Sequence, residues 1–309
     1  MKASAKTAKK NGAKKAVRSL PQVQAAANAL DALRKRRPLV ACLTNSVAEA
    51  FTADVLLALG ARCMMVADGG EVLKFIEMAD AILVNCGTVT KERGEVLRAA
   101  VTRANSLGKP WVLDPVAYGP LPLRTFLCNE FMRRRPTVIR ANASETAALA
   151  GDESAARGVD AVSMEGDPAQ TARVSAACLT AMLTTGRVDY VAATDPVTRL
   201  TAPTISVGNG HEMLARVPGT GCAQGAIAAA FAAVASSPEA AAVAASLTMA
   251  LAGEVAARKA SAPGSFKVAL VDALAMLKPA DILKNAKVST IKGTGSPPPP
   301  PPPPIATED

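Results

Sequence analysis

The stretch Arg216-Val217-Pro218-Gly219-Thr220-Gly221-Cys222-Ala223-Gln224-Gly225 joins a glycine-rich turn to an alanine-rich run that predicts a helix over residues 223–234. Two glycines that flank a threonine let the backbone bend so that several N–H groups face one point. The helix directs the positive end of its dipole to the same point. An anion, above all a phosphate, fits there, with Cys222 in the first helical turn. A short glycine motif also occurs by chance in loops that merely begin a helix, so the rest of the chain must distinguish the two interpretations.

Apolar segments that alternate with helical patterns on the N-terminal side of this turn predict the fold class. The segments at 39–43, 63–66, 81–84, 111–113 and 137–139 are short and apolar, and helical spacing fills the stretches between them. Strands that are apolar throughout and are joined through helices form a parallel sheet that is covered on both faces. We therefore expect a three-layer α/β fold with a mostly parallel central sheet.

The pattern changes after Gly151, where the strand–helix alternation becomes less regular. The later segments predict, in order, a polar loop at 152–167, a helix over 169–183, an antiparallel pair of strands at 188–193 and 200–206, and alanine-rich helices over 223–234, 238–259 and 266–278. This part of the chain is expected to complete the same domain rather than to form a repeat of the first part.

Composition excludes several classes of function. The chain has 309 residues, half of them hydrophobic, which is enough for one large core or two small ones. Its six cysteines are scattered without Cys-x-x-Cys spacing, which argues against zinc ribbons and thioredoxin chemistry and indicates reduced thiols in a reducing compartment. The single histidine, His211, is expected to be a turn residue. We expect no membrane span, because no apolar run looks long and pure enough to cross a bilayer.

The two ends of the chain differ from its middle. Residues 1–18 contain seven Lys and Arg residues and no acid, so most of the formal net charge of +9 lies there. We expect a basic disordered tail at 1–19, with organellar import as a minor alternative, a globular domain at 20–290 and a proline-rich disordered tail at 291–309. The proline run at 297–304 predicts polyproline II, which a proline-recognition domain could bind. A nucleic-acid partner is not expected, because the body is nearly charge-balanced and aromatic residues make up 3% of the chain.

Polar residues directly follow four of the predicted strands, and this is the strongest functional signal that the residues themselves give. They are Asn45, Asn85, Asp114 and Arg140. Ligands of open parallel sheets bind beyond the carboxyl ends of the strands, so these side chains are expected to share one rim, with Thr185 in a similar loop. A carboxylate beside an arginine and an anion-binding turn suits Mg²⁺ with phosphate.

Each of these residues also has a structural explanation. Asn142 and Glu145 have the spacing of a helix capping box, which alone would explain both. Asp114 precedes Pro115 and could simply form a turn. Met65 is most simply a core residue, although it could line an apolar pocket if it lies at the rim.

Several short motifs together carry a family resemblance. In chain order they are Cys42-Leu43-Thr44-Asn45, Phe51-Thr52-Ala53, Leu56–Ala61, Asn85-Cys86-Gly87-Thr88, Leu113-Asp114-Pro115-Val116, Ile139–Glu145, Arg157-Gly158-Val159-Asp160, Val188-Asp189-Tyr190-Val191, Gly219-Thr220-Gly221-Cys222 and Pro263-Gly264-Ser265-Phe266. The order and content of these motifs, over about residues 38–277, resemble the hydroxyethylthiazole kinases of thiamine salvage, within the ribokinase-like superfamily. Most of the motifs are weak alone, and their order makes the resemblance specific.

The resemblance implies ATP-dependent phosphorylation of the hydroxyl of 4-methyl-5-(2-hydroxyethyl)thiazole with Mg²⁺, in a cytoplasmic homotrimer. It assigns substrate binding to Met65, Gly219 and Asn45, ATP binding to Arg140 and Thr185, Mg²⁺ binding to Asp114 and Glu145, and catalysis to Cys222, Gly219 and Gly221. Alanines at 41 and 141 depart from the residues usual in the family, as do Glu49 and Ala50. A kinase of another small alcohol and a catalytically silent ligand-binding subunit therefore stay as alternatives.

Cys222 stands where many ribokinase relatives have an aspartate base. A helix N-terminus is expected to lower the pKa of a thiol from about 8.5, whereas the charge of a bound triphosphate would oppose a thiolate. We therefore expect Cys222 to position the alcohol and to act at most as a weak base. The amides of residues 219–222 would hold the transferring phosphoryl group.

Overall fold

A computed structural model describes residues 20–66, 68–152 and 165–291. The predicted tail at 1–19, all but Ile291 of the predicted tail at 291–309 and most of the predicted polar loop at 152–167 lie outside these residues. The strands are β1 (Leu39–Leu43), β2 (Arg62–Met65), β3 (Ala81–Asn85), β4 (Trp111–Asp114), β5 (Val138–Asn142), β6 (Ala181–Thr185), β7 (Asp189–Ala193), β8 (Thr204–Val207) and β9 (Val288–Ile291). The helices are α2 (Pro21–Arg36), α3 (Glu49–Leu59), α4 (Val72–Met78), α5 (Lys91–Ser106), α6 (Pro122–Arg133), α7 (Ala143–Leu149), α8 (Pro168–Cys178), α9 (Met213–Arg216), α10 (Thr220–Ala232), α11 (Pro238–Ala257), α12 (Pro263–Met276) and α13 (Pro279–Asn285).

The strands form one sheet in the order β2-β1-β3-β4-β5-β6-β7-β8-β9. From β2 to β6 every neighbouring pair is parallel, and from β6 to β9 every pair is antiparallel. The carboxyl ends of β1, β3, β4, β5 and β6 therefore meet at one edge of the sheet. The predicted three-layer α/β fold with a mostly parallel sheet is confirmed.

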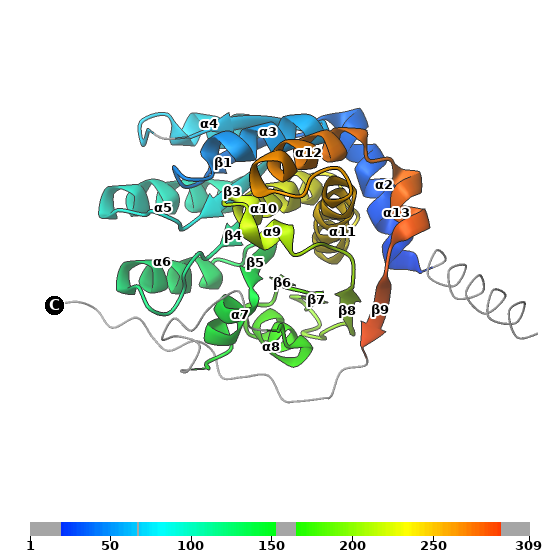
Figure 1. Ribbon diagram of the computed structural model, residues 1–309. Coiled ribbons are helices and arrows are strands. Elements are labelled where there is room, and N and C mark those ends of the chain that lie inside the picture. The colour runs from blue at the N-terminus through cyan, green and yellow to red at the C-terminus, as the bar shows by residue number, and fades with distance from the viewer. Residues whose placement is uncertain (1–19, 67, 153–164, 292–309) are drawn as a thin grey trace, which may run out of the picture.

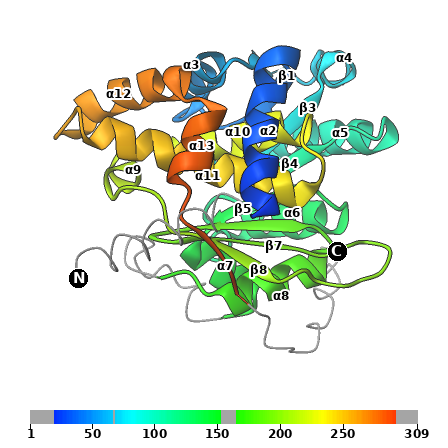
Figure 2. The same cartoon turned by 90° about the vertical axis from the view of Figure 1, so that its right-hand side faces the viewer.

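Residues of β1, β3, β4, β5 and β6 alternate between two cores, because successive side chains point to opposite faces of a sheet. Val40 and Leu83 face a core that α2, α3, α10, α11 and α12 complete. Ala41 and Val84 face a second core, completed by α4, α5 and α6. Figure 1 shows α4, α5 and α6 on one side of the strands and the C-terminal helices on the other, and Figure 2 shows α13 beside α2.

Helix α11 is the longest helix among the described residues and is apolar enough to cross a membrane by length and composition. The expectation that no run has these properties was therefore wrong. The apolar window of α11 is 83% buried inside the protein, however, where it packs against α10, α12 and α2. The helix therefore belongs to the core.

One predicted helix differs from the structure, and three elements were not predicted. The predicted helix at 169–183 is helix α8 followed by strand β6, because Leu179 takes a left-handed conformation (φ 54°) that ends the helix. The Thr180 hydroxyl then donates to the Thr137 carbonyl and fixes the start of the strand. Helices α9 and α13 and strand β9 were not predicted, and β9 reaches Ile291, one residue beyond the predicted domain boundary.

Candidate active site

The strand-end residues lie together, joined by a chain of hydrogen bonds. Asn45 Nδ2 donates to Asn85 Oδ1 at 2.9 Å and to Cys222 Sγ at 3.2 Å. Asn85 Nδ2 in turn donates to Asp114 Oδ2 at 2.7 Å. The chain of contacts thus runs from the thiol at the start of α10 to the carboxylate at the end of β4, as the predicted rim requires.

Asp114 is fully buried, yet one of its oxygens is unused. Among the described residues Oδ1 has no hydrogen-bond partner, and Arg140 Nη1 approaches it at 3.7 Å. Burial raises the pKa of the carboxyl to about 6, although the charge of Arg140 opposes the rise and that of Glu145 adds to it. An unsatisfied buried oxygen is rare in native structures, so Oδ1 fits a ligand for a cation or for ordered water.

Arg140 lies inside β5 rather than after it, and its guanidinium packs against the start of α10. Its Nη2 donates to Thr185 Oγ1 at 2.7 Å, and Nε has no partner within the described part of the chain. A Cβ placed on Gly221 would lie 2.7 Å from both terminal nitrogens. A glycine is therefore needed at 221 for the guanidinium to reach Thr185 and Asp114 together, and the remaining donors suit an anion.

The glycine-rich turn forms the N-terminus of α10, which begins at Thr220 rather than at the predicted Ala223. Gly219 is its N-cap with φ 87°, a conformation that side chains rarely adopt. The Thr220 hydroxyl donates to the Leu214 carbonyl at 2.7 Å and fixes the turn from behind. The first backbone N–H groups of a helix have no intrahelical acceptor, so this turn presents amides next to the Arg140 guanidinium.

The Cys222 thiol is neutral at physiological pH. Burial raises its pKa to about 11, the charge of Asp114 adds to the rise, and Arg140, Asn45 and Asn85 oppose it. The expectation that the helix N-terminus lowers this pKa was wrong, because the thiol is mostly buried and lies close to a carboxylate. A neutral thiol beside Asn45 is suited to positioning a hydroxyl group rather than to removing its proton.

We expect alkylation of Cys222 by iodoacetamide to accelerate by about tenfold per pH unit from pH 7 to 9.5, because the thiolate fraction keeps rising below a pKa of about 11. An ordinary thiol would level off near pH 8.5. Mass spectrometry of the labelled peptide gives the rate, and the Cys222→Ser variant gives the background from other thiols. A plateau near pH 8 would contradict the buried, neutral thiol.

Glu145 forms the capping box that its spacing predicts. The Asn142 side chain accepts from the Glu145 N–H, Glu145 Oε2 accepts from the Asn142 N–H, and Oε1 accepts from the Ala117 N–H at 2.8 Å. Both carboxylate oxygens of Glu145 therefore already accept hydrogen bonds from backbone amides. Capping explains Glu145 structurally, and any metal contact would have to use its remaining lone pairs or pass through water.

Met65 packs on the core, which was its simplest expected place, whereas the structure places Thr185 differently from the expectation. Met65 ends the edge strand β2 opposite Cys42, is half-buried, and packs on the core shared with α3 and α10. Thr185 is the last residue of β6 rather than a loop residue, and it is the one that contacts Arg140. Sequence analysis gave no role to Asp189, a buried carboxylate at the start of β7, because its place after a turn resembles an ordinary strand beginning.

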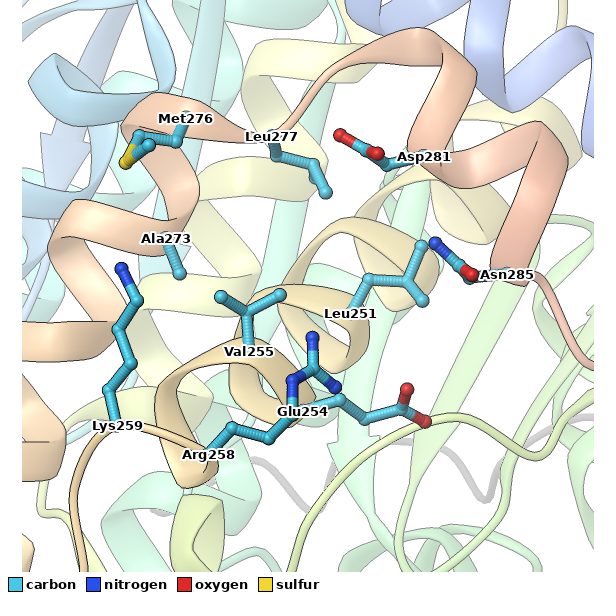
Figure 3. Close-up of a pocket in the computed structure, with 10 residues that line it drawn as sticks. All are labelled: Leu251, Glu254, Val255, Arg258, Lys259, Ala273, Met276, Leu277, Asp281 and Asn285. Carbon is cyan, nitrogen blue, oxygen red and sulfur yellow. The ribbon is translucent and has the colours of Figure 1, made fainter.

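A pocket of about 250 Å³ lies between α11, α12 and α13, away from the rim residues (Figure 3). Apolar side chains such as Leu251 and Val255 form part of its lining, and Arg258 and Lys259 lie at its edge. Its lining shares no residue with the hydrogen-bonded rim. We therefore assign the chemistry to the rim and not to this pocket.

The model of the hydroxyethylthiazole kinase family matches residues 30–280. A hydroxyethylthiazole kinase of Akkermansia muciniphila is 43% identical and the match covers 86% of this chain and 96% of that protein. One of Klebsiella pneumoniae (strain 342) is 45% identical over 78% of this chain and 91% of its own length.

Solved structures agree with the sequence comparisons. The hydroxyethylthiazole kinase of Pyrococcus horikoshii OT3 superposes with a TM-score of 0.77 and 37% identity, covering 86% of this chain and 99% of that one. A ribokinase-like superfamily protein of Enterococcus faecalis V583 superposes with a TM-score of 0.53 at 14% identity, which supports the fold alone. Residues 30–280, which the family model matches, include every residue of the hydrogen-bonded rim.

Proposed function

The chain belongs to the hydroxyethylthiazole kinase family, and we propose that the rim from Asn45 to Thr185 is where it transfers the γ-phosphoryl group of ATP to hydroxyethylthiazole. Phosphorylation of this alcohol in thiamine salvage is the function of the family. The observation that carries the site assignment is the contact of Asp114, Arg140 and Gly221 at the N-terminus of α10. Carboxylate, guanidinium and helix amides at one point are the groups that phosphoryl transfer requires.

We propose that Arg140 and Thr185 bind the nucleotide. The Arg140 guanidinium is held by Thr185 on one side and by the Gly221 backbone on the other, so its donors face a fixed direction. The Thr220 N–H donates to the Val217 carbonyl at 3.4 Å, so the other amides of residues 219–222 would hold the transferring phosphoryl group. Fixed donors stabilise developing charge without reorganisation during the reaction, which is the main contribution a protein makes to this chemistry.

We propose that Asp114 holds Mg²⁺, with Glu145 contributing through water. Among the described residues no group of three or more His, Cys, Asp or Glu side chains could bind a metal. Mg²⁺ typically takes one or two carboxylates together with phosphate oxygens and water, so the unused Oδ1 of Asp114 fits this role. When bound, the ion would neutralise charge on the phosphate oxygens.

Asn45, Met65, Gly219 and Cys222 are proposed to receive the thiazole alcohol. The alcohol oxygen forms its bond to the γ-phosphorus while the bond to ADP breaks, and the hydroxyl proton is released. A loose transition state does not require the alcohol to ionise first, so a neutral thiol can hold the hydroxyl in line without acting as a strong base. The hydrogen bond from Asn45 fixes the Cys222 sulfur for this purpose.

The proposal also includes a cytoplasmic homotrimer. Exposed apolar side chains at Val47, Leu57 and Val268 lie on or beside α3 and α12, which pack together. Such side chains suit burial between subunits. Light scattering is expected to give three times the mass of the chain, and a monomer mass would overturn this part of the proposal.

A coupled assay tests the function directly. ADP release should require both Mg²⁺ and hydroxyethylthiazole, and replacement of the thiazole by other small alcohols should abolish it. Release with another alcohol alone would retain the reaction type and change the substrate. ATP binding without turnover on any alcohol would favour a silent ligand-binding subunit.

A further inference from the structure

Besides Asp114 and Glu145 there is a third buried carboxylate, Asp189, which joins three elements behind the rim and has no role in the reaction described above. It is 7% exposed and stands at the start of β7. Its Oδ1 accepts from the Gly186 N–H at 3.0 Å, and its Oδ2 accepts from Ser246 Oγ at 2.7 Å and Gln224 Nε2 at 3.4 Å. A buried carboxylate with donors from three separate elements fixes those elements relative to one another.

The partners of Asp189 lead directly to the proposed nucleotide site. Gly186 follows Thr185, so its bond to Asp189 closes the turn that holds the Thr185 hydroxyl against Arg140. Gln224 lies one helical turn beyond Gly221 on α10, and Ser246 lies on α11. Asp189 therefore ties the end of β6 to the N-terminus of α10, the two elements between which the Arg140 guanidinium is held.

Charge strengthens the connection. Burial raises the pKa of the Asp189 carboxyl, and its hydrogen bonds and the positive charge of Arg140 oppose the rise. The carboxylate and the guanidinium are thus close enough to interact electrostatically. The attraction between this buried negative charge and the guanidinium helps to retain Arg140 in its place.

We propose that Asp189 is a positioning residue for nucleotide binding, which sets the Thr185–Arg140 contact relative to the N-terminus of α10. The inference rests on the proposed function, because it takes Arg140 and Thr185 as the nucleotide contacts. Asp189 acts through these residues. Its loss is therefore expected to weaken ATP binding and to leave binding of the thiazole alcohol, on the Asn45 side of the rim, unchanged.

The test compares Asp189→Asn with the wild type by calorimetric titration of ATP and by steady-state kinetics with both substrates varied. Loss of the charge and of one acceptor is expected to raise the Kd and KM for ATP by about tenfold, while the KM for the thiazole alcohol stays within about twofold. A lower melting temperature with an unchanged ATP Kd, or equal rises in both KM values, would overturn the inference.

Two further variants keep the test decisive. Ser246→Ala removes the 2.7 Å hydrogen bond but leaves the carboxylate, and it should raise the ATP KM in the same direction by a smaller factor, even if Asp189→Asn fails to fold. Thr171→Val is the matched control, because it breaks another buried polar contact, between Thr171 and Thr184, that lies outside the rim. Thr171→Val should lower the melting temperature without changing the ATP KM, and a rise like that of Asp189→Asn would overturn the inference.

The double variant Asp189→Asn/Thr185→Val separates this inference from the proposed function. If Asp189 acts through Thr185, the ATP Kd of the double variant should stay within about twofold of the ATP Kd of Thr185→Val. Additive losses would overturn the positioning role and leave the site intact. Failure of the wild type to bind ATP would instead overturn the proposed function.

Discussion

Replacing Asp114 by asparagine is expected to lower kcat by about a thousandfold while the protein stays folded. Asparagine keeps the shape of the side chain and can still accept the hydrogen bond from Asn85 Nδ2. It removes the negative charge and the unpaired Oδ1 that fits a cation. The loss should therefore fall on the chemical step, which single-turnover kinetics at saturating ATP and thiazole alcohol measures.

The same variant has a pH signature in stability. The Asp114 carboxyl has a pKa of about 6 in the folded protein against an ordinary value of 3.8, so between these values the folded chain keeps a proton that the unfolded chain has lost. Ionisation of this carboxyl therefore lowers the free energy of unfolding of the wild type as pH rises from about 4 to about 6. Asparagine cannot ionise, so the melting temperature of Asp114→Asn relative to wild type should rise across this window and then stay constant.

Asp80→Asn provides the control for Asp114→Asn. Asp80 accepts from the Leu39 N–H at 2.7 Å just before β3, at the opposite edge of the sheet, and is exposed. The Asp80→Asn variant should keep the kcat of the wild type. A kcat of Asp114→Asn within tenfold of the wild type would contradict a role for this carboxylate in the reaction.

Part of the rim could be predicted from sequence, because Asn45, Asn85 and Asp114 end or directly follow short apolar strands. In a parallel sheet the ends of such strands converge whatever the helices between them do, so Asn45, Asn85 and Asp114 needed only a correct strand assignment. The glycine turn was recognisable from its residues, since position 219 has a positive φ and position 221 leaves no room for a Cβ. Local chemistry and sheet topology thus determine most of this site.

The parts that sequence analysis missed depend on packing between distant segments. The apolar run at 181–185 is short and follows an alanine-rich helix, so only its pairing with β5 and β7 distinguishes it as a strand. The raised pKa of Cys222 comes from burial and from Asp114, which are not evident from its place at a helix N-terminus. Asp189 similarly gains its partners from α10 and α11, far away in the chain.

Replacing Gly221 by alanine is expected to separate activity from stability at this site. The backbone at 221 is helical, so alanine is conformationally acceptable there. Its Cβ would lie 2.7 Å from Arg140 Nη1 and Nη2, and the flexible guanidinium is the group that has to move. The move breaks the contacts of Arg140 with Thr185 and Asp114, so kcat/KM for ATP should fall by about a hundredfold while the melting temperature changes by only a few degrees.

The glycine at 94 offers the matched control for this prediction, because it also lies in a helix and an added Cβ would meet a flexible side chain. The neighbour there is Leu127 at 3.2 Å, an apolar side chain that can adjust without affecting the rim. Gly94→Ala should therefore keep wild-type kcat/KM. If Gly221→Ala also keeps it, the guanidinium does not need its place against α10, and the assignment of Arg140 to the nucleotide is wrong. If Gly221→Ala instead unfolds at much lower temperature, the glycine serves the helix rather than the site, because displacement of a flexible side chain alone costs little stability.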